Sequence, residues 1–180
     1  RTTRRSYSEQ AVVVFRIRSW RRNNSARWTP SGMPEEEKYP MMRDAEKTIG
    51  SIIDKVSVSI IGSVDENDFP NAKAMLPPRK REGIRHIYFT TNTSSMRVKQ
   101  YAANPKACVY FFDHRFFTGV MLKGTMAVLQ DQKSKQMIWQ DGDEMYYAKG
   151  VTDPDYCVLK FTAHSGRYYR DFKSENFAVE

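Results

Sequence analysis

Apolar and polar residues alternate along much of the chain with the two-residue period of β-strands. The clearest alternation runs from Ile87 to Thr91, and Ala107 to Phe112 and Tyr156 to Thr162 are apolar runs of strand length. The other expected strands are Val56 to Val64, Asn71 to Leu76, Phe116 to Gln130 and Arg167 to Phe172. The pattern therefore predicts roughly seven strands.

Helical spacing of apolar residues is limited to a few segments. The stripe from Met41 to Val56 carries acidic residues early and Lys55 late, which is typical of a helix that packs on a sheet. Met96 to Ala103, Asp131 to Trp139 and Asp143 to Lys149 also have helical composition. These segments predict a small number of short helices.

Clusters of polar and turn-forming residues mark the connections. Asp65 to Pro70 predicts a turn between two antiparallel strands, and Arg79 to Gly83 predicts a charged loop. His164 to Gly166 is expected to separate the last two strands. Lys173 to Glu180 is expected to be a polar tail.

Gly119 and Gly124 interrupt the longest apolar run, and glycines inside strands commonly mark bulges or the bends of a barrel. Strands and helices do not alternate strictly, and the chain has no internal repeat. The predicted fold class is therefore mainly β (α+β), an antiparallel barrel with a few packed helices.

Positive charge is concentrated at one end of the chain. The net charge is +8, and residues 1–28 contain eight arginines and one acidic residue. We interpret residues 1–32 as a basic, disordered extension and residues 33–180 as the folded domain. The alternative is an arm that binds nucleic acid, with Trp20 and Trp28 as stacking residues.

The cysteines and histidines do not form a metal-binding pattern. Cys108 and Cys157 lie in apolar runs, which favours small buried side chains in a reducing cytoplasm. His86, His114 and His164 are far apart in the sequence, so no metal site is expected. No apolar run reaches the length of a membrane span, so no membrane partner is expected.

Residues 87–112 combine a strand, a polar turn, a basic helix and a second strand. Ser94 and Ser95 are candidate N-caps, and Arg97 and Lys99 lie in the first turn of the helix. A helix start with free N–H groups, hydroxyls and cations can hold a phosphate. The alternative is an ordinary capped helix with solvated basic residues.

This stretch resembles the phosphate-binding segment of the pyridoxamine 5'-phosphate oxidase-like family, which includes the general stress proteins. The matching residues, in the same order and spacing, are Thr91-Asn92, Ser95, Met96, Arg97, Gln100 and Asn104-Pro105. The sequence departs from the family at Met96, where the family has an arginine. One of two usual phosphate cations is therefore missing.

The resemblance implies an FMN-binding split β-barrel over about residues 35–172. It also implies a homodimer with the flavin at the subunit interface. Aromatic residues such as Phe111-Phe112 and Phe116-Phe117 are candidates for that interface, although core packing explains them equally well. Some relatives on this barrel bind a deazaflavin or haem instead.

The resemblance also assigns cofactor-binding positions. Lys73, Ala74, Met75 and Leu76 match the strand that runs along the isoalloxazine edge, with Lys73 in place of a phosphate- or ring-contacting arginine. The remaining matches are Thr90 and Thr91 for the ribityl chain and phosphate, Ser95, Met96 and Arg97 for the phosphate clamp, and Thr118 for a residue that reaches the flavin.

The function expected from the resemblance is an FMN-dependent oxidoreductase of unknown substrate. No catalytic residue is assigned, because the flavin itself performs the electron transfer. Arg167 and Arg170 are the candidates for substrate binding near the C-terminus. Two alternatives remain open: a stress protein that binds its cofactor without catalysis, and a nucleic-acid-binding module.

Overall fold

The structure is a computed structural model that describes residues 42–114 and 117–180. The predicted basic extension and its nucleic-acid arm, residues 1–32, lie outside the described residues, as does Phe116 of the predicted interface. Residues 40–180 form one compact unit. In the part of the chain that is described, no helix combines the length and apolar character needed to cross a membrane.

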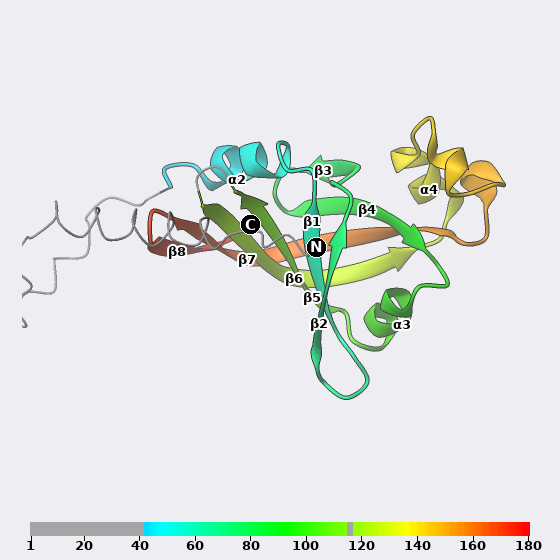
Figure 1. Ribbon diagram of the computed structural model, residues 1–180, viewed down its shortest axis with the longest axis horizontal. Coiled ribbons are helices and arrows are strands. Elements are labelled where there is room, and N and C mark those ends of the chain that lie inside the picture. The colour runs from blue at the N-terminus through cyan, green and yellow to red at the C-terminus, as the bar shows by residue number, and fades with distance from the viewer. Residues whose placement is uncertain (1–41, 115–116) are drawn as a thin grey trace, which may run out of the picture. The chain divides into compact units, whose positions relative to one another are not determined.

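The described chain is built on an antiparallel sheet of eight strands, in the order β2-β1-β5-β6-β7-β4-β3 with β8 paired to β7 (Figure 1). The strands are β1 (Ser59–Val64), β2 (Pro70–Met75), β3 (Lys80–Glu82), β4 (His86–Asn92), β5 (Lys106–Asp113), β6 (Thr118–Leu129), β7 (Tyr156–Arg170) and β8 (Lys173–Ala178). The first half of β7 pairs with β4 and its second half pairs with β8. The long strand β7 therefore joins two parts of the sheet.

Helices form at the predicted places: α3 has the predicted bounds, the others are shorter, and the turn η2 was not predicted. They are α2 (Ala45–Ile53), α3 (Met96–Ala103), α4 (Gln132–Ile138) and the 3-10 turns η1 (Asp143–Met145) and η2 (Gly150–Thr152). Asp44 accepts the N–H of Lys47 and Asp131 accepts that of Ser134, so both aspartates cap their helices.

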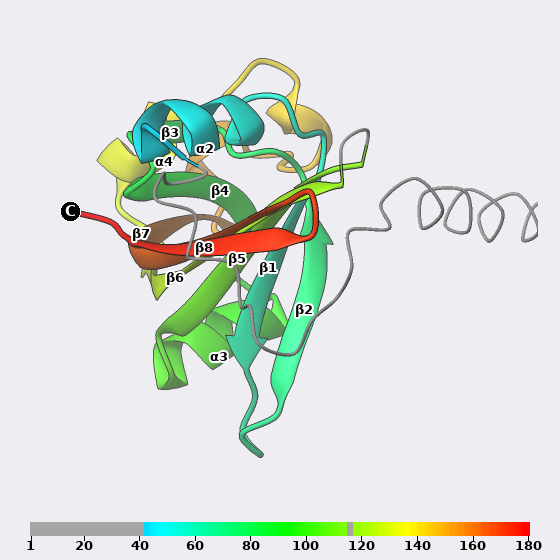
Figure 2. The ribbon, with the colours of Figure 1, turned by 90° about the vertical axis from the view of Figure 1, so that its left-hand side faces the viewer.

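Helix α2 closes the main hydrophobic core. Ile49 and Ile53 of α2 are buried with Ile61, Phe111 and Phe161 from three different strands. Figure 2 shows α2 lying across the sheet. Each such side chain contributes about 1.5–3 kcal/mol when it leaves water, so the amphipathic stripe accounts for the position of the helix.

A second cluster lies under α4. Tyr88, Ile138, Tyr147, Tyr156 and Val158 are buried together, and the rings of Tyr147 and Tyr156 are 4.7 Å apart between centroids. This cluster fixes the segment from α4 to η2 against β4 and β7. It thereby places η1 beside the end of β4.

The expected bulge is present at Gly124. The register between β6 and β7 shifts between Lys123 and Gly124, and a Cβ atom at Gly124 would overlap the carbonyl oxygen of Thr162. Gly119 lies instead in regular pairing, where the hydroxyl of Tyr110 occupies the space that a side chain would need. Of the two glycines, only Gly124 marks a bulge. Gly119 instead allows the side chain of Tyr110 to approach the backbone closely.

Two predictions about the C-terminal region were wrong. Strands were expected on either side of His164 to Gly166, but β7 continues through these residues because β6 pairs along its whole length. Lys173 to Glu180 was expected to be a polar tail outside the strands, but residues 173–178 form β8. A two-residue turn at Asp171 and Phe172, both with positive φ, joins β8 to β7 without the usual Asn-Gly signal.

The predicted loop from Arg79 to Gly83 also contains a strand. Residues 80–82 form β3, which pairs with residues 86–88 of β4. Gly83, with φ of 62°, supplies the left-handed turn between them. The charged sequence masked this edge strand, since charges are common on sheet edges.

Candidate functional site

The turn between β4 and α3 holds the predicted phosphate clamp. Ser95 has the extended backbone of an N-cap, but its side chain makes no capping hydrogen bond. Its Oγ atom and the Nη1 atom of Arg97 are shielded from solvent and have no hydrogen-bond partner among the described residues. Buried donors of this kind are costly unless a ligand oxygen accepts from them.

A carboxylate from the loop before β7 fixes this turn. Asp155 accepts a hydrogen bond from Nδ2 of Asn92 at 2.7 Å, and its backbone oxygen accepts the N–H of Thr93 at 2.7 Å. The Asp155 carboxylate also accepts hydrogen bonds from the backbone N–H and the hydroxyl of Ser94. Hydrogen bonds from Asn92 and then Ser94 hold the pKa of Asp155 below its usual value. The turn is therefore ordered by a residue about sixty positions away in the sequence.

Helix α3 is fastened to β1 by residues of the same motif. Gln100 accepts a buried hydrogen bond from the hydroxyl of Ser63 at 2.6 Å, and the hydroxyl of Tyr101 donates to the carbonyl of Gly62 at 3.1 Å. Burial raises the pKa of Tyr101 to about 12, while the charge of Arg97 acts in the opposite direction. Arg97 therefore lies close enough to the core for its charge to be felt there.

A cavity of about 230 Å³ lies beside this turn. It gathers six of the ten predicted cofactor residues from two separate strands: Lys73, Ala74, Met75, Leu76, Thr90 and Thr91. Asn92 also lines it and leads directly into the turn at Ser95. The clamp and the cavity are therefore continuous along the chain.

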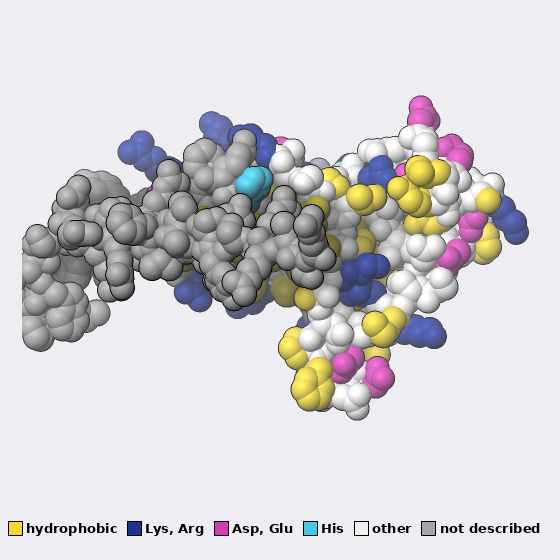
Figure 3. Space-filling view, viewed as in Figure 1, with side chains coloured by type: hydrophobic (Ala, Val, Ile, Leu, Met, Phe, Trp, Pro, Cys, Tyr) yellow, Lys and Arg dark blue, Asp and Glu magenta, His cyan; other side chains and the backbone are white. Residues whose placement is uncertain are grey.

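Several residues of the cavity wall were not predicted. Arg79 lines it from the segment before β3, and Tyr146 and Tyr147 line it from the residues directly after η1. Tyr146 is 60% exposed, and Figure 3 shows hydrophobic side chains gathered on the α4 region. The sequence signal for these residues was the pair of tyrosines shortly after Gly142, which has a left-handed backbone. Nothing in the local sequence, however, indicates that this segment lies beside β2 and β4.

Four predicted residues do not line the cavity: Ser95, Met96 and Arg97 at the start of α3, and Thr118. Met96 is 60% exposed on the first turn of α3. Thr118 begins β6 and lines a different cavity of about 300 Å³ with Lys55, Tyr168 and Arg170. The neighbours of Thr90 on β7 pair with the opposite end of the 12-residue strand β6. Within one chain, Thr118 therefore lies far from the predicted residues that line the cavity.

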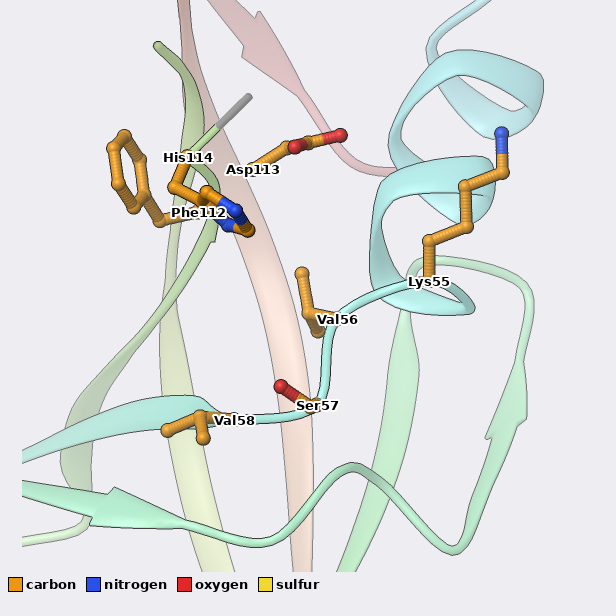
Figure 4. A pocket seen from close by; sticks show the side chains of 7 residues that line it. All are labelled: Lys55, Val56, Ser57, Val58, Phe112, Asp113 and His114. Carbon is orange, nitrogen blue, oxygen red and sulfur yellow. The ribbon is translucent and has the colours of Figure 1, made fainter. Parts of the chain in front are cut away.

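Another cavity, of about 830 Å³, lies where α2 leads into β1 (Figure 4). Its wall includes Lys55 and Val56 after α2, and Asp113 and His114 at the end of β5. Figure 4 shows Asp113 and His114 side by side across from Val56. None of the ten predicted site residues lines this cavity.

The outer face of β1, β5 and β6 is open and largely apolar. A shallow groove of about 940 Å³ crosses it, lined by residues that include Ile60, Ala72, Cys108 and Tyr110. Ile60 is 40% exposed, and Phe112 next to this face is 39% exposed. Exposed apolar surface of this extent is typical of an interaction face.

Comparison with known proteins finds a matching family model and solved structures of similar fold. The family model described as "Pyridoxamine 5'-phosphate oxidase like" matches residues 44–179. A protein from Clostridium acetobutylicum, related to general stress protein 26 of Bacillus subtilis, has 39% sequence identity and a TM-score of 0.69; the match covers 75% of this chain and 94% of that one. A search of curated proteins finds no significant match.

More distant structures share the fold. An FMN-binding protein related to pyridoxamine 5'-phosphate oxidase from Nostoc punctiforme has 11% identity and a TM-score of 0.54, over 78% of this chain and all of that one (100%). A heme-binding protein from Mycobacterium smegmatis has 13% identity and a TM-score of 0.62, over 75% of this chain and 58% of that one. At these identities the likeness concerns the barrel alone.

Proposed function

Because the chain belongs to the pyridoxamine 5'-phosphate oxidase-like family, we propose that it is a flavoprotein that binds FMN and exchanges electrons with a small molecule. The expected family and the antiparallel split barrel are both confirmed. The flavin supplies the redox chemistry when it is bound, and the protein binds it, orients it and excludes water.

The shielded, unpartnered donors at the start of α3 carry the proposal. Ser95 Oγ and Arg97 Nη1 fit a phosphate monoester, which offers several acceptor oxygens and negative charge. The adjoining cavity, with the segment from Lys73 to Leu76 on its wall, would receive the rest of the cofactor. The donor set therefore suits FMN.

Uptake of FMN by the purified full chain tests the proposal. We expect quenching of FMN fluorescence, and we expect Arg97→Ala to weaken binding by about 1.5–3 kcal/mol, the usual contribution of a charge-assisted hydrogen bond. Lys133→Ala is the control, because Lys133 is an exposed cation on α4 and does not line the candidate cavity. Unquenched FMN at high protein concentration, or haem binding in its place, contradicts the assignment.

Riboflavin separates a phosphate contact from a ring contact. It has the same ring as FMN and no phosphate, so Arg97→Ala is expected to leave riboflavin binding unchanged. An equal loss of affinity for FMN and riboflavin in Arg97→Ala would show that Arg97 does not contact the phosphate.

We further propose that two copies of the chain form the complete site. A cavity of about 230 Å³ in one chain is smaller than the roughly 300–1,000 Å³ of typical ligand sites. A second copy on the open face of β1, β5 and β6 would cover exposed apolar surface. It would also supply Thr118, which is remote from the cavity of its own chain.

The oligomeric state tests this arrangement. Ile60→Glu, on the open face, is expected to convert a dimer to a monomer in light scattering and to weaken FMN binding. Met137→Glu is the control, since Met137 is 38% exposed against 40% for Ile60 but lies on α4. A monomeric wild-type chain that binds FMN fully would refute the shared site.

The electron donor is the least constrained part of the proposal. We propose a nicotinamide or a reduced deazaflavin, tested by anaerobic mixing of the FMN-loaded protein with NADH, NADPH or reduced deazaflavin. Bleaching of the flavin band by one donor supports an oxidoreductase, and an unchanged band with all three favours a non-catalytic role. The unpaired thiols Cys108 and Cys157 support a reducing compartment, and we propose the cytoplasm.

A further inference from the structure

Arg79 is an arginine that the family motif does not use and that lines the candidate FMN cavity. Its Nη2 atom is 2.6 Å from Oδ1 of Asp143, and its Nη1 atom donates to Oε1 of Gln140. Its backbone N–H donates to the carbonyl of Tyr88 at 2.9 Å. Both the backbone and the guanidinium group are therefore held in place.

The third nitrogen of this guanidinium group, Nε, has no acceptor among the described residues. The Nε atom of Arg79 is shielded from solvent and has no hydrogen-bond partner among the described residues. The Arg79 side chain is 17% exposed and that of Asp143 is 4% exposed, so the ion pair is largely removed from water. A fixed, shielded N–H on a residue that lines a cavity is suited to a ligand oxygen or nitrogen that accepts a hydrogen bond.

The strand register places Arg79 away from the phosphate clamp. Lys80 pairs with Tyr88, so Arg79 lies level with Phe89 on β4. The clamp begins after Asn92, three residues further along, which is about 10 Å at the rise of a β-strand. Arg79 and Arg97 therefore face different parts of a ligand.

We propose that Arg79 donates from Nε to the pyrimidine edge of the flavin ring, and that its ion pair with Asp143 sets the preference of the site for reduced over oxidised flavin. The inference rests on the proposed FMN function. Two electrons and one proton convert the oxidised ring to its anionic reduced form, whose negative charge lies over N1 and the C2 carbonyl. A cation at this edge favours the reduced form, and Asp143 offsets part of that effect.

The two partners of the ion pair are therefore expected to act in opposite directions. Arg79→Gln should lower the ratio of affinities for reduced and oxidised FMN about tenfold, which for a two-electron couple makes the midpoint potential about 30 mV more negative. Asp143→Asn should shift the potential to more positive values, because it leaves the arginine charge uncompensated.

Arg81→Gln is the matched control. Arg81 lies on β3, and its Nη2 atom is 2.7 Å from Oδ2 of Asp54. It also contacts Glu46 of α2, and it does not line the candidate FMN cavity. This variant removes an arginine from an ion pair and is expected to leave the potential unchanged.

The experiment is an anaerobic dithionite titration of the FMN-loaded full chain in the presence of a reference dye, with FMN and riboflavin affinities measured in parallel. Opposite shifts for Arg79→Gln and Asp143→Asn, with no shift for Arg81→Gln, support the proposal. Equal affinity losses without a shift in potential, or shifts of the same sign, overturn it, since a merely structural ion pair gives that result. If Arg79→Gln does not fold, the sign of the shift in Asp143→Asn decides.

Failure of the underlying function gives a different result. A wild-type chain that takes up neither FMN nor riboflavin refutes the proposed function itself. A wild-type chain that binds FMN, with variants that keep its potential, refutes only the role of Arg79.

Discussion

The carboxylate of Asp155 accepts two hydrogen bonds from Ser94, which lies in a different loop. Oδ1 of Asp155 accepts the backbone N–H of Ser94 at 2.7 Å, and Oδ2 accepts its hydroxyl at 3.1 Å. The serine precedes the N-cap of α3, and the aspartate precedes β7. The order of the candidate phosphate turn therefore depends on a contact between segments 61 residues apart.

The first prediction concerns this contact. Asp155→Ala is expected to weaken FMN binding about three- to tenfold, because a turn that is no longer held must be ordered on binding. Fluorescence titration measures the effect. Asp65→Ala is the control, since Asp65 also accepts two backbone N–H groups at 2.9 Å but in the β1–β2 turn. Equal affinity in wild type and Asp155→Ala would show that the turn is ordered without the carboxylate.

The second prediction concerns the stability of the protein at low pH. Hydrogen bonds from Asn92 and Ser94 hold the pKa of Asp155 below its ordinary value of 3.8. Its stabilising contribution is therefore fully present above pH 3.8 and is lost as the pH falls through the lower, folded-state pKa. The difference in free energy of unfolding between wild type and Asp155→Asn should be constant from pH 7 to about pH 4 and shrink below that. Urea unfolding at several pH values measures it, and a difference that grows in acid contradicts the assignment.

The third prediction restores the missing cation of the family motif. Met96 is 60% exposed at the first turn of α3, so a longer side chain meets no packed neighbours there. Met96→Arg is expected to strengthen FMN binding about three- to tenfold and to leave riboflavin binding unchanged, because the added charge acts on the phosphate. Met137→Arg on α4 controls for net charge. An equal gain from both variants would indicate general electrostatic attraction.

The fourth prediction tests the bulge in β6. Gly124→Ala is expected to destabilise the protein by about 3 kcal/mol, or roughly 10 °C in Tm, because the new Cβ atom meets the rigid backbone of Thr162. Gly166→Ala should cost less, since its Cβ atom meets the ring of Phe177, which can move with β8. Thermal unfolding followed by circular dichroism measures both. A larger loss for Gly166→Ala would contradict this ranking.

The sequence predicted most of the elements because their signals are local. The alternation from Ile87 to Thr91 and the Asp131 cap act through neighbouring residues, and both were found where they were expected. The bulge at Gly124 was also found, because a glycine inside an apolar run is itself visible in the sequence. The strand β8 was missed, because Lys173 to Ala178 has little apolar character and takes its conformation from pairing with β7. Local propensity is a weak guide for edge strands, whose stability comes from their partner.

The sequence by itself indicated the family, most of the helices and strands, and the candidate phosphate motif around Ser95 and Arg97, since these depend on residues close together in the chain. Only the tertiary structure decided what surrounds that motif. It brought Asp155 to the turn, it paired Arg79 of the cavity wall with Asp143, and it left Thr118 at the far end of β6. Such contacts join residues tens of positions apart, and strand register and side-chain packing in three dimensions select them rather than any local pattern.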